Sequence, residues 1–138
     1  MAEESSKENL ILAKYSVKAI VENLKEGNSS MTYSELSIKL KELCGINRSR
    51  RQLGEPLGIV QDYCSELKLP TLPATVARQD SDEMPGNKFI TCYRGNHPDA
   101  AEIDEEVIVR AAQKACKEWK NWQKIYDRVG LDEYAPTM

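Results

Sequence analysis

Two helices joined by a short turn, predicted in the second quarter of the chain, constrain the fold more than any other feature. The first is expected over 32–44, because Thr32 and Glu35 have the spacing of a reciprocal capping box and Gly45 supplies a stop. The second is expected over 49–67, where apolar residues recur at helical spacing. This order predicts a helix-turn-helix.

Further elements are expected on both sides of the helix pair. An amphipathic helix is predicted over 7–26, and a long helix over 104–129 that ends at Gly130. Strands predicted over 74–78 and 88–93 would form a β-hairpin, the wing. The tip between these strands carries three carboxylates, Asp80, Asp82 and Glu83.

The expected fold class is therefore α+β, a winged helix-turn-helix with an added N-terminal helix and a long C-terminal helix. A single domain is expected over 7–130, with a polar tail at 1–6 and a second tail at 131–138. The 138 residues suffice for one core and are few for two. Pro56 lies inside the second helix of the pair, where we expect a kink.

Composition narrows the function classes. No apolar run approaches the roughly 20 residues of a membrane span, and the acidic N-terminus does not resemble a signal peptide, so we expect a cytoplasmic protein without membrane contact. The net charge of −3 argues against a protein that coats nucleic acid non-specifically. Four scattered cysteines and one histidine predict neither a metal site nor another cofactor site.

Basic residues concentrate where the second helix of the pair begins. Residues 31–60 carry five basic and three acidic side chains, whereas the rest of the chain is mildly acidic. Arginines at this place can form forked contacts with guanine or phosphate, although they can also be a solvated patch. The predicted DNA-binding residues are Tyr33, Arg48, Ser49, Arg50, Arg51 and Gln52. The acidic wing tip would repel phosphates and opposes this interpretation.

Aromatic residues recur along the predicted C-terminal helix. Trp119, Trp122 and Tyr126 follow one another every three or four positions. Such residues can pack inside their own domain. Because Trp and Tyr also anchor interfaces, they can instead contact a protein partner or a second copy in a homodimer.

Three motifs resemble a known family over roughly residues 31–93. They are Thr-Tyr-Ser-Glu-Leu from Thr32, Arg-Gln-Leu-Gly-x-x-Leu-Gly from Arg51, and Leu-Pro-Ala-Thr-Val from Leu72. This order resembles the DNA-binding winged-helix domain of O6-alkylguanine-DNA alkyltransferases and alkyltransferase-like proteins. The resemblance implies that Arg51 fills the gap left by a flipped base and that Tyr33 lies at the start of the first motif helix. The pattern is also similar to accessory domains attached to restriction-type nucleases.

The chain departs from this family where alkyl transfer would occur. The alkyltransferases carry Pro-Cys-His-Arg, whereas this chain has Pro73-Ala74-Thr75-Val76, so the acceptor thiol and its histidine partner are absent. The sequence also lacks a glycine-rich phosphate loop, a His-Glu-x-x-His motif and a Gly-x-Ser-x-Gly motif. We therefore expect no catalytic residues and no enzyme activity.

Two functions remain as hypotheses. The first is a non-catalytic protein that binds double-stranded DNA through the helix that starts near Arg48. The alternative is a protein-interaction module, such as a small inhibitor or adaptor of a nucleic-acid enzyme in a phage or defence setting. It would use the acidic wing or the C-terminal helix as its contact surface.

Overall fold

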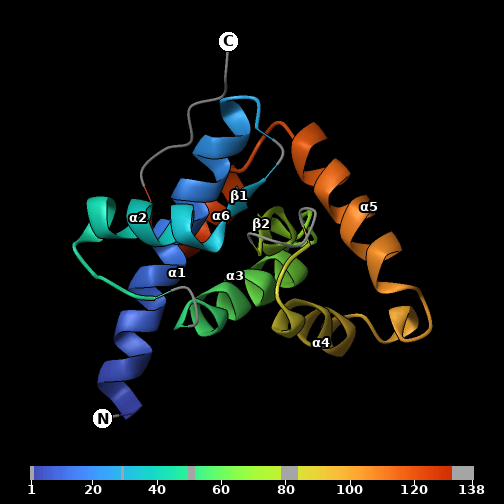
Figure 1. Cartoon of the computed structure of the whole chain (residues 1–138), viewed down its shortest axis with the longest axis horizontal. Coiled ribbons are helices and arrows are strands. Elements are labelled where there is room, and N and C mark those ends of the chain that lie inside the picture. The colour runs from blue at the N-terminus through green and yellow to red at the C-terminus, as the bar shows by residue number, and fades with distance from the viewer. Residues whose placement is uncertain (1, 29, 50–51, 79–83, 132–138) are drawn as a thin grey trace.

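The structure of the chain, a computed structural model, describes residues 2–28, 30–49, 52–78 and 84–131, with backbone only for 2–6, 87 and 88 (Figure 1). It is mostly helical with a small two-stranded sheet, which is an α+β composition. The elements are α1 Ala2–Lys25, β1 Met31–Thr32, α2 Tyr33–Cys44, α3 Gly54–Leu67, the 3-10 helix η2 Leu72–Thr75, β2 Val76–Ala77, α4 Asn87–Asn96, the 3-10 helix η3 Pro98–Ala100, α5 Glu105–Glu118 and α6 Gln123–Val129.

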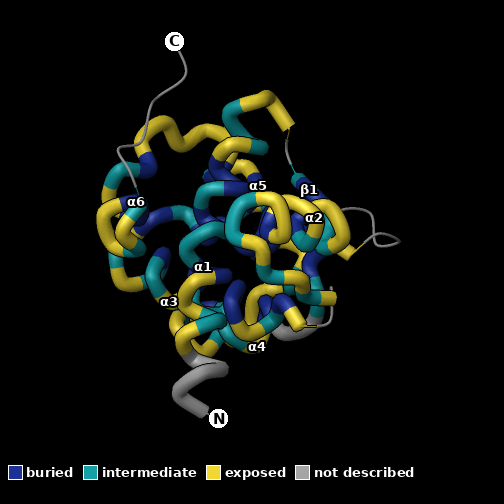
Figure 2. Tube along the Cα trace, turned by 90° about the vertical axis from the view of Figure 1, so that its left-hand side faces the viewer, coloured by how far each residue is buried: buried dark blue, intermediate teal, exposed yellow. Residues whose placement is uncertain are grey.

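The main core forms around α1, which packs against α2, α3, α6 and η2. Figure 1 shows α1 running through the middle of the molecule, with its N-terminal turns extending beyond the other helices. Figure 2 shows how the buried positions gather where these helices meet. The largest fully buried side chains are Trp122, Leu12, Ile20, Leu36, Leu40, Leu53, Leu72, Ile125, Val17, Val21, Val60 and Val76.

A second, smaller core joins η2, α4 and α5. Its buried members are Ala74, Phe89, Ile90, Ala100, Ile108 and Val109. This cluster attaches α4 and α5 to η2, the segment that follows α3. The exposed side of α5 includes Val107, whose side chain is 59% exposed.

The parallel sheet brings together two segments far apart in the sequence. Met31 pairs with Val76, and Thr32 pairs with Ala77. Both strands have only two residues, so the sheet acts as a clasp between the start of α2 and the end of η2.

Local signals place α2 as predicted. The Thr32 hydroxyl accepts from the Glu35 N–H at 3.1 Å, and the Glu35 carboxylate accepts from the Thr32 N–H at 2.9 Å. Gly45 ends the helix with a φ of 75°, a left-handed conformation that favours glycine. The capping box and the glycine stop are both confirmed.

The predicted β-hairpin is wrong. Residues 88–93 belong to α4, and 74–78 contributes only Val76–Ala77, which pairs in parallel with β1. Helix α4 is favoured by aromatic side chains four residues apart: the Phe89 and Tyr93 rings lie 5.9 Å apart, and Tyr93 stacks on His97 at 4.2 Å. The carboxylates predicted for the wing tip, Asp80, Asp82 and Glu83, lie outside the described residues.

The second helix of the pair begins later than predicted. Helix α3 starts at Gly54 and not at 49, and it is continuous to Leu67, so the expected kink is also wrong. Pro56 lies in its first turn, where the missing N–H has no helical acceptor and the fixed φ suits the helix.

The predicted C-terminal helix over 104–129 is two helices, α5 and α6. Trp119 has an extended conformation with ψ of 132°, and the Asn121 side chain accepts from the Gln123 N–H at 2.9 Å at the start of α6. At the other end of the chain, α1 begins at Ala2, so residues expected to form a polar tail belong to the helix. Most of the predicted tail at 131–138 lies outside the described residues.

Candidate nucleic-acid interface

The connection between α2 and α3, residues 45–53, is here called the basic turn. Gln52 closes it locally: its N–H donates to the Ser49 carbonyl at 2.9 Å, and its side-chain oxygen accepts from the Ser49 N–H at 3.0 Å. The Leu53 side chain is fully buried and fixes the end of the turn in the main core. Asn47, Ser49 and Gln52 are exposed, so the described part of this connection presents polar side chains to solvent.

Arg48 ties the basic turn to two helices. Its guanidinium lies 2.6 Å from the Glu8 carboxylate of α1, and its carbonyl accepts a hydrogen bond from the Ser37 hydroxyl of α2. The Arg48 side chain remains 25% exposed and that of Glu8 44% exposed. An ion pair this accessible contributes at most about 1 kcal/mol, so a phosphate can compete with Glu8 for the guanidinium.

The charge of the turn comes from arginines alone. Residues 43–54 contain three arginines and no carboxylate. Two of them, Arg50 and Arg51, lie outside the described residues, so the structure places Arg48, Ser49 and Gln52 of the predicted set but not these two.

The exposed side of α3 has the opposite charge. Glu55, Asp62 and Glu66 are exposed there, and Gly54–Leu67 contains no lysine or arginine. Glu66 forms an ion pair with Arg128 at 2.9 Å. A DNA groove lying along the length of α3 would meet carboxylates, whereas the preceding turn would offer it cations. Positive charge therefore precedes α3, and negative charge lies along its exposed side.

Tyr33 is partly buried at the start of α2. Its hydroxyl accepts from the Gly86 N–H at 2.8 Å, which links α2 to the segment before α4. A Cβ placed on Gly86 would lie 3.1 Å from this hydroxyl oxygen, so the close approach suits glycine. Burial raises the pKa of the Tyr33 phenol above its ordinary value, although the hydrogen bond from Gly86 opposes the shift. Tyr33 is therefore a neutral group that still has a proton to donate.

Tyr33 also borders a small hollow, with a volume of about 20 Å³, beside the end of the basic turn. Its lining residues are Tyr33, Gly54, Leu57, Gly58, Gln61, Pro73 and Phe89. The buried Gln61 amide donates to the Phe89 carbonyl at 3.1 Å. This hollow was not predicted from the sequence, although Gly54 and Gly58, four residues apart on one helix face, were an available signal.

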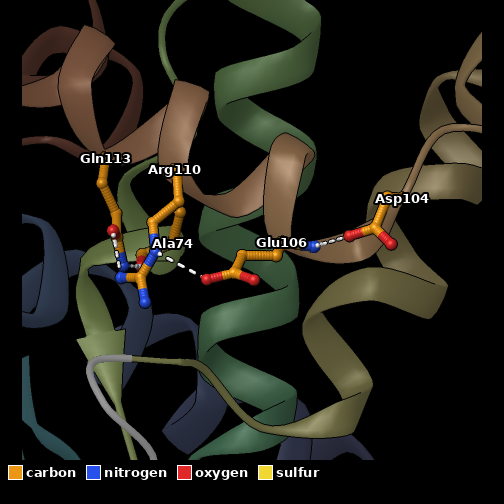
Figure 3. A network of polar contacts seen from close by, with 5 residues as sticks. All are labelled: Ala74, Asp104, Glu106, Arg110 and Gln113. Atoms are coloured by element: carbon orange, nitrogen blue, oxygen red, sulfur yellow. Dashed lines mark hydrogen bonds and ion pairs between the residues drawn. The ribbon is translucent and has the colours of Figure 1, made fainter.

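Ala74, which the sequence resemblance would align with the acceptor cysteine of the alkyltransferases, is completely buried. Its carbonyl accepts from the buried Gln113 side chain of α5 at 3.0 Å. Figure 3 shows this contact together with two contacts of Arg110. Arg110 donates to the Gln113 amide oxygen at 3.1 Å and lies 3.6 Å from the Glu106 carboxylate. At the helix start, the Asp104 carboxylate accepts from the Glu106 N–H at 2.9 Å. This part of the chain docks α5 on η2.

Replacing Gln113 with alanine is expected to lower the free energy of unfolding by about 1–3 kcal/mol, because the Ala74 carbonyl would stay buried without its donor. Urea unfolding followed by circular dichroism measures the change. Gln123→Ala is the control: this amide bonds to Asp127 at an exposed site, so its removal should change the stability by less than about 0.5 kcal/mol. Equal effects of the two substitutions would contradict the docking role of Gln113.

The predicted aromatic interface divides into buried and exposed members. Trp122 is 1% exposed and Tyr126 is 7% exposed, so both belong to the main core. Trp119, in the connection between α5 and α6, is 42% exposed. Core packing is therefore confirmed for two of the three residues, and Trp119 alone keeps an accessible ring surface.

The thiols deep in the molecule are not poised for nucleophilic chemistry. Burial raises the pKa of Cys64 to about 12, and burial also holds the pKa of Cys116 well above its ordinary value. Among the described residues, no three histidine, cysteine, aspartate or glutamate side chains come together as metal ligands. No helix in the described part of the chain has the length and apolar character needed to cross a bilayer.

Comparison of the chain with protein families, curated proteins and solved structures found no match. Its function is therefore inferred from its own residues.

Proposed function

We propose that this chain is a non-catalytic protein that binds double-stranded DNA through the basic turn. The observation that carries the proposal is a polar, solvent-facing turn held between two helices, in a stretch with three arginines and no carboxylate. Hydrogen bonds between Gln52 and Ser49, together with burial of Leu53, hold the described part of this turn before any ligand arrives, which would lower the entropic cost of binding.

The proposed contact is to phosphates and the edge of a groove, and α3 does not lie lengthwise in the groove. Acidic side chains on the exposed side of α3 oppose a lengthwise contact, whereas no side chain caps the α3 N-terminus at Leu53. The first N–H groups of a helix carry partial positive charge and favour an anion. Arginines of the turn and the N–H groups at the start of α3 would thus act on the same phosphates, while the exposed Glu55 in the first turn of α3 opposes this contact.

We also propose that the fold is a variant of the winged helix-turn-helix. The order of helix, strand, two helices and strand supports this relation, and α4 occupies the place of the second wing strand. The resemblance to alkyltransferases in the motifs around Tyr33 and Arg51 supports it as well. The buried alanine at position 74 makes binding without alkyl transfer the expected activity.

Titration of a fluorescently labelled duplex with the protein tests DNA binding directly. Three arginine contacts predict a slope of about −2.7 for log affinity against log salt, hence an affinity about fortyfold lower at 200 mM than at 50 mM salt. Fluorescence anisotropy at a series of salt concentrations measures this slope. Absence of binding at 50 mM salt, or an affinity that does not change with salt, would overturn the proposal.

A protein-interaction module is the second candidate. The acidic side of α3, with Glu55 and Asp62 exposed, favours it because this surface suits a basic partner better than DNA. The exposed Val107 and Ile103 near the start of α5 add apolar area outside the core. Such a module would show no salt-dependent affinity for duplex DNA, so the same titration separates the two candidates.

A further inference from the structure

A second cationic surface lies where α5 passes into α6. Residues 113–124 contain four lysines and one glutamate, whereas the other positions of the chain carry fifteen basic and twenty-one acidic side chains. Residues 117–121 are all exposed and lead into α6 (Figure 2). This is a lysine-rich stretch of an acidic chain, and it belongs to elements other than the basic turn between α2 and α3 (Figure 1).

An oriented indole stands within this surface. The Trp119 N–H donates to the Asn121 carbonyl at 2.6 Å, and its ring lies 6.3 Å from that of Trp122 with a tilt of 55°. Trp122 is fully buried and therefore gives Trp119 a fixed neighbour. The hydrogen bond to Asn121 and the contact with Trp122 together fix the orientation of the exposed Trp119 ring.

An exposed indole among lysines matches the chemistry of unpaired nucleotides. Proteins that bind single strands stack bases on aromatic rings and meet the neighbouring phosphates with basic side chains. A protein partner fits less well, because the centre of a protein interface is depleted in charge and enriched in apolar neighbours. Here Trp122 and Tyr126 are buried, and the exposed sequence neighbours of Trp119 are Lys117, Glu118, Lys120 and Asn121, with Lys124 exposed in the first turn of α6.

We propose that Lys117, Trp119, Lys120 and Lys124, here called the Trp119 patch, bind single-stranded nucleic acid. One unpaired base stacks on the Trp119 ring, and phosphates on either side of it contact the lysines. This site does not depend on the proposed duplex contact at the basic turn. A chain with both sites can hold a duplex and an adjoining single strand.

The test uses an oligothymidylate of about 15 nucleotides as the probe, within the site sizes of single-strand binders. Wild-type protein is expected to show quenching of tryptophan fluorescence on titration, because Trp119 is the accessible indole. Anisotropy of the labelled oligonucleotide is expected to show binding at least about tenfold weaker for Trp119→Ala, with most of the affinity kept in Trp119→Phe. Lys117→Ala/Lys120→Ala should lower the magnitude of the salt slope by about 1.4.

Lys39→Ala/Lys41→Ala is the matched charge control, since it removes two exposed lysines from α2 and should leave oligothymidylate binding unchanged. Circular dichroism checks that each variant is folded. No binding of the oligonucleotide by wild-type protein, or equal binding by wild type, Trp119→Ala and Trp119→Phe, would overturn the proposal. Binding of oligothymidylate without duplex binding would refute the basic-turn proposal alone, and duplex binding without oligothymidylate binding would refute this one alone.

Discussion

Replacing Arg50 and Arg51 together with alanine is expected to weaken duplex binding by about a hundredfold at moderate salt. Each arginine contact with a phosphate or a guanine edge contributes about 1–3 kcal/mol, and 1.4 kcal/mol corresponds to a tenfold change in affinity. Arg48 has Glu8 as a partner within the protein, so these two neighbours in sequence are expected to supply most of the charge that the turn offers to DNA. Anisotropy with a labelled duplex, at several salt concentrations, measures the loss.

Two further variants give this experiment its specificity. Arg50→Lys/Arg51→Lys keeps the charge and removes the forked geometry, so it should retain the salt slope and lose part of the affinity. Lys39→Ala/Lys41→Ala removes the same charge from the exposed side of α2 and should have a much smaller effect. If the arginine and lysine double variants weakened binding equally, net charge rather than the basic turn would determine affinity.

Replacing Trp122 with alanine is expected to lower the free energy of unfolding by about 3–5 kcal/mol, as for other large aromatic residues removed from a core. Trp122 is 1% exposed and packs in the cluster that joins α1, α3 and α6. For a domain whose total stability is about 5–15 kcal/mol, this loss takes away a large part of the folded population at raised temperature.

Trp119→Ala is the control for this measurement, because the chemical change is identical and the site is 42% exposed. We expect it to cost less than about 1 kcal/mol. Urea unfolding followed by circular dichroism gives both values, and an unchanged urea dependence shows that the midpoint shift reports stability. Equal losses from the two substitutions would contradict the separation of the tryptophans into a buried and an exposed member.

The elements predicted well are those with signals at both ends. Helix α2 has its capping box at Thr32 and its glycine stop at Gly45, and both form as expected. Gly130, predicted to close the last helix, has a φ of 80° and caps α6. Such signals act through hydrogen bonds between residues a few positions apart, so the sequence alone is sufficient to predict them.

The errors concern segments whose structure depends on distant packing. Residues 88–93 have strand-forming side chains, yet Phe89 and Ile90 reach the second core as parts of α4. Aromatic residues at helical spacing through Trp119 and Trp122 predicted one helix, whereas the structure has a break between α5 and α6. At this break Trp122 is buried in the main core, among residues far away in sequence. For the candidate site, the order of helix, turn and helix could be predicted. The ion pair of Arg48 with Glu8, across forty positions, could not.

The clasp formed by β1 and β2 has a consequence for how the sequence of this protein can vary. Pairing of Thr32 with Ala77 places the chain just before α2 beside the chain that follows η2. The sheet thus holds both ends of the segment that contains α2 and α3. Apolar anchors such as Leu36 and Val60 hold the pair against α1. Substitutions in the basic turn would therefore cost only local contacts, such as those of Ser49 with Gln52 and of Arg48 with Glu8, and the surface that the turn offers to a ligand could change while the helix pair is retained.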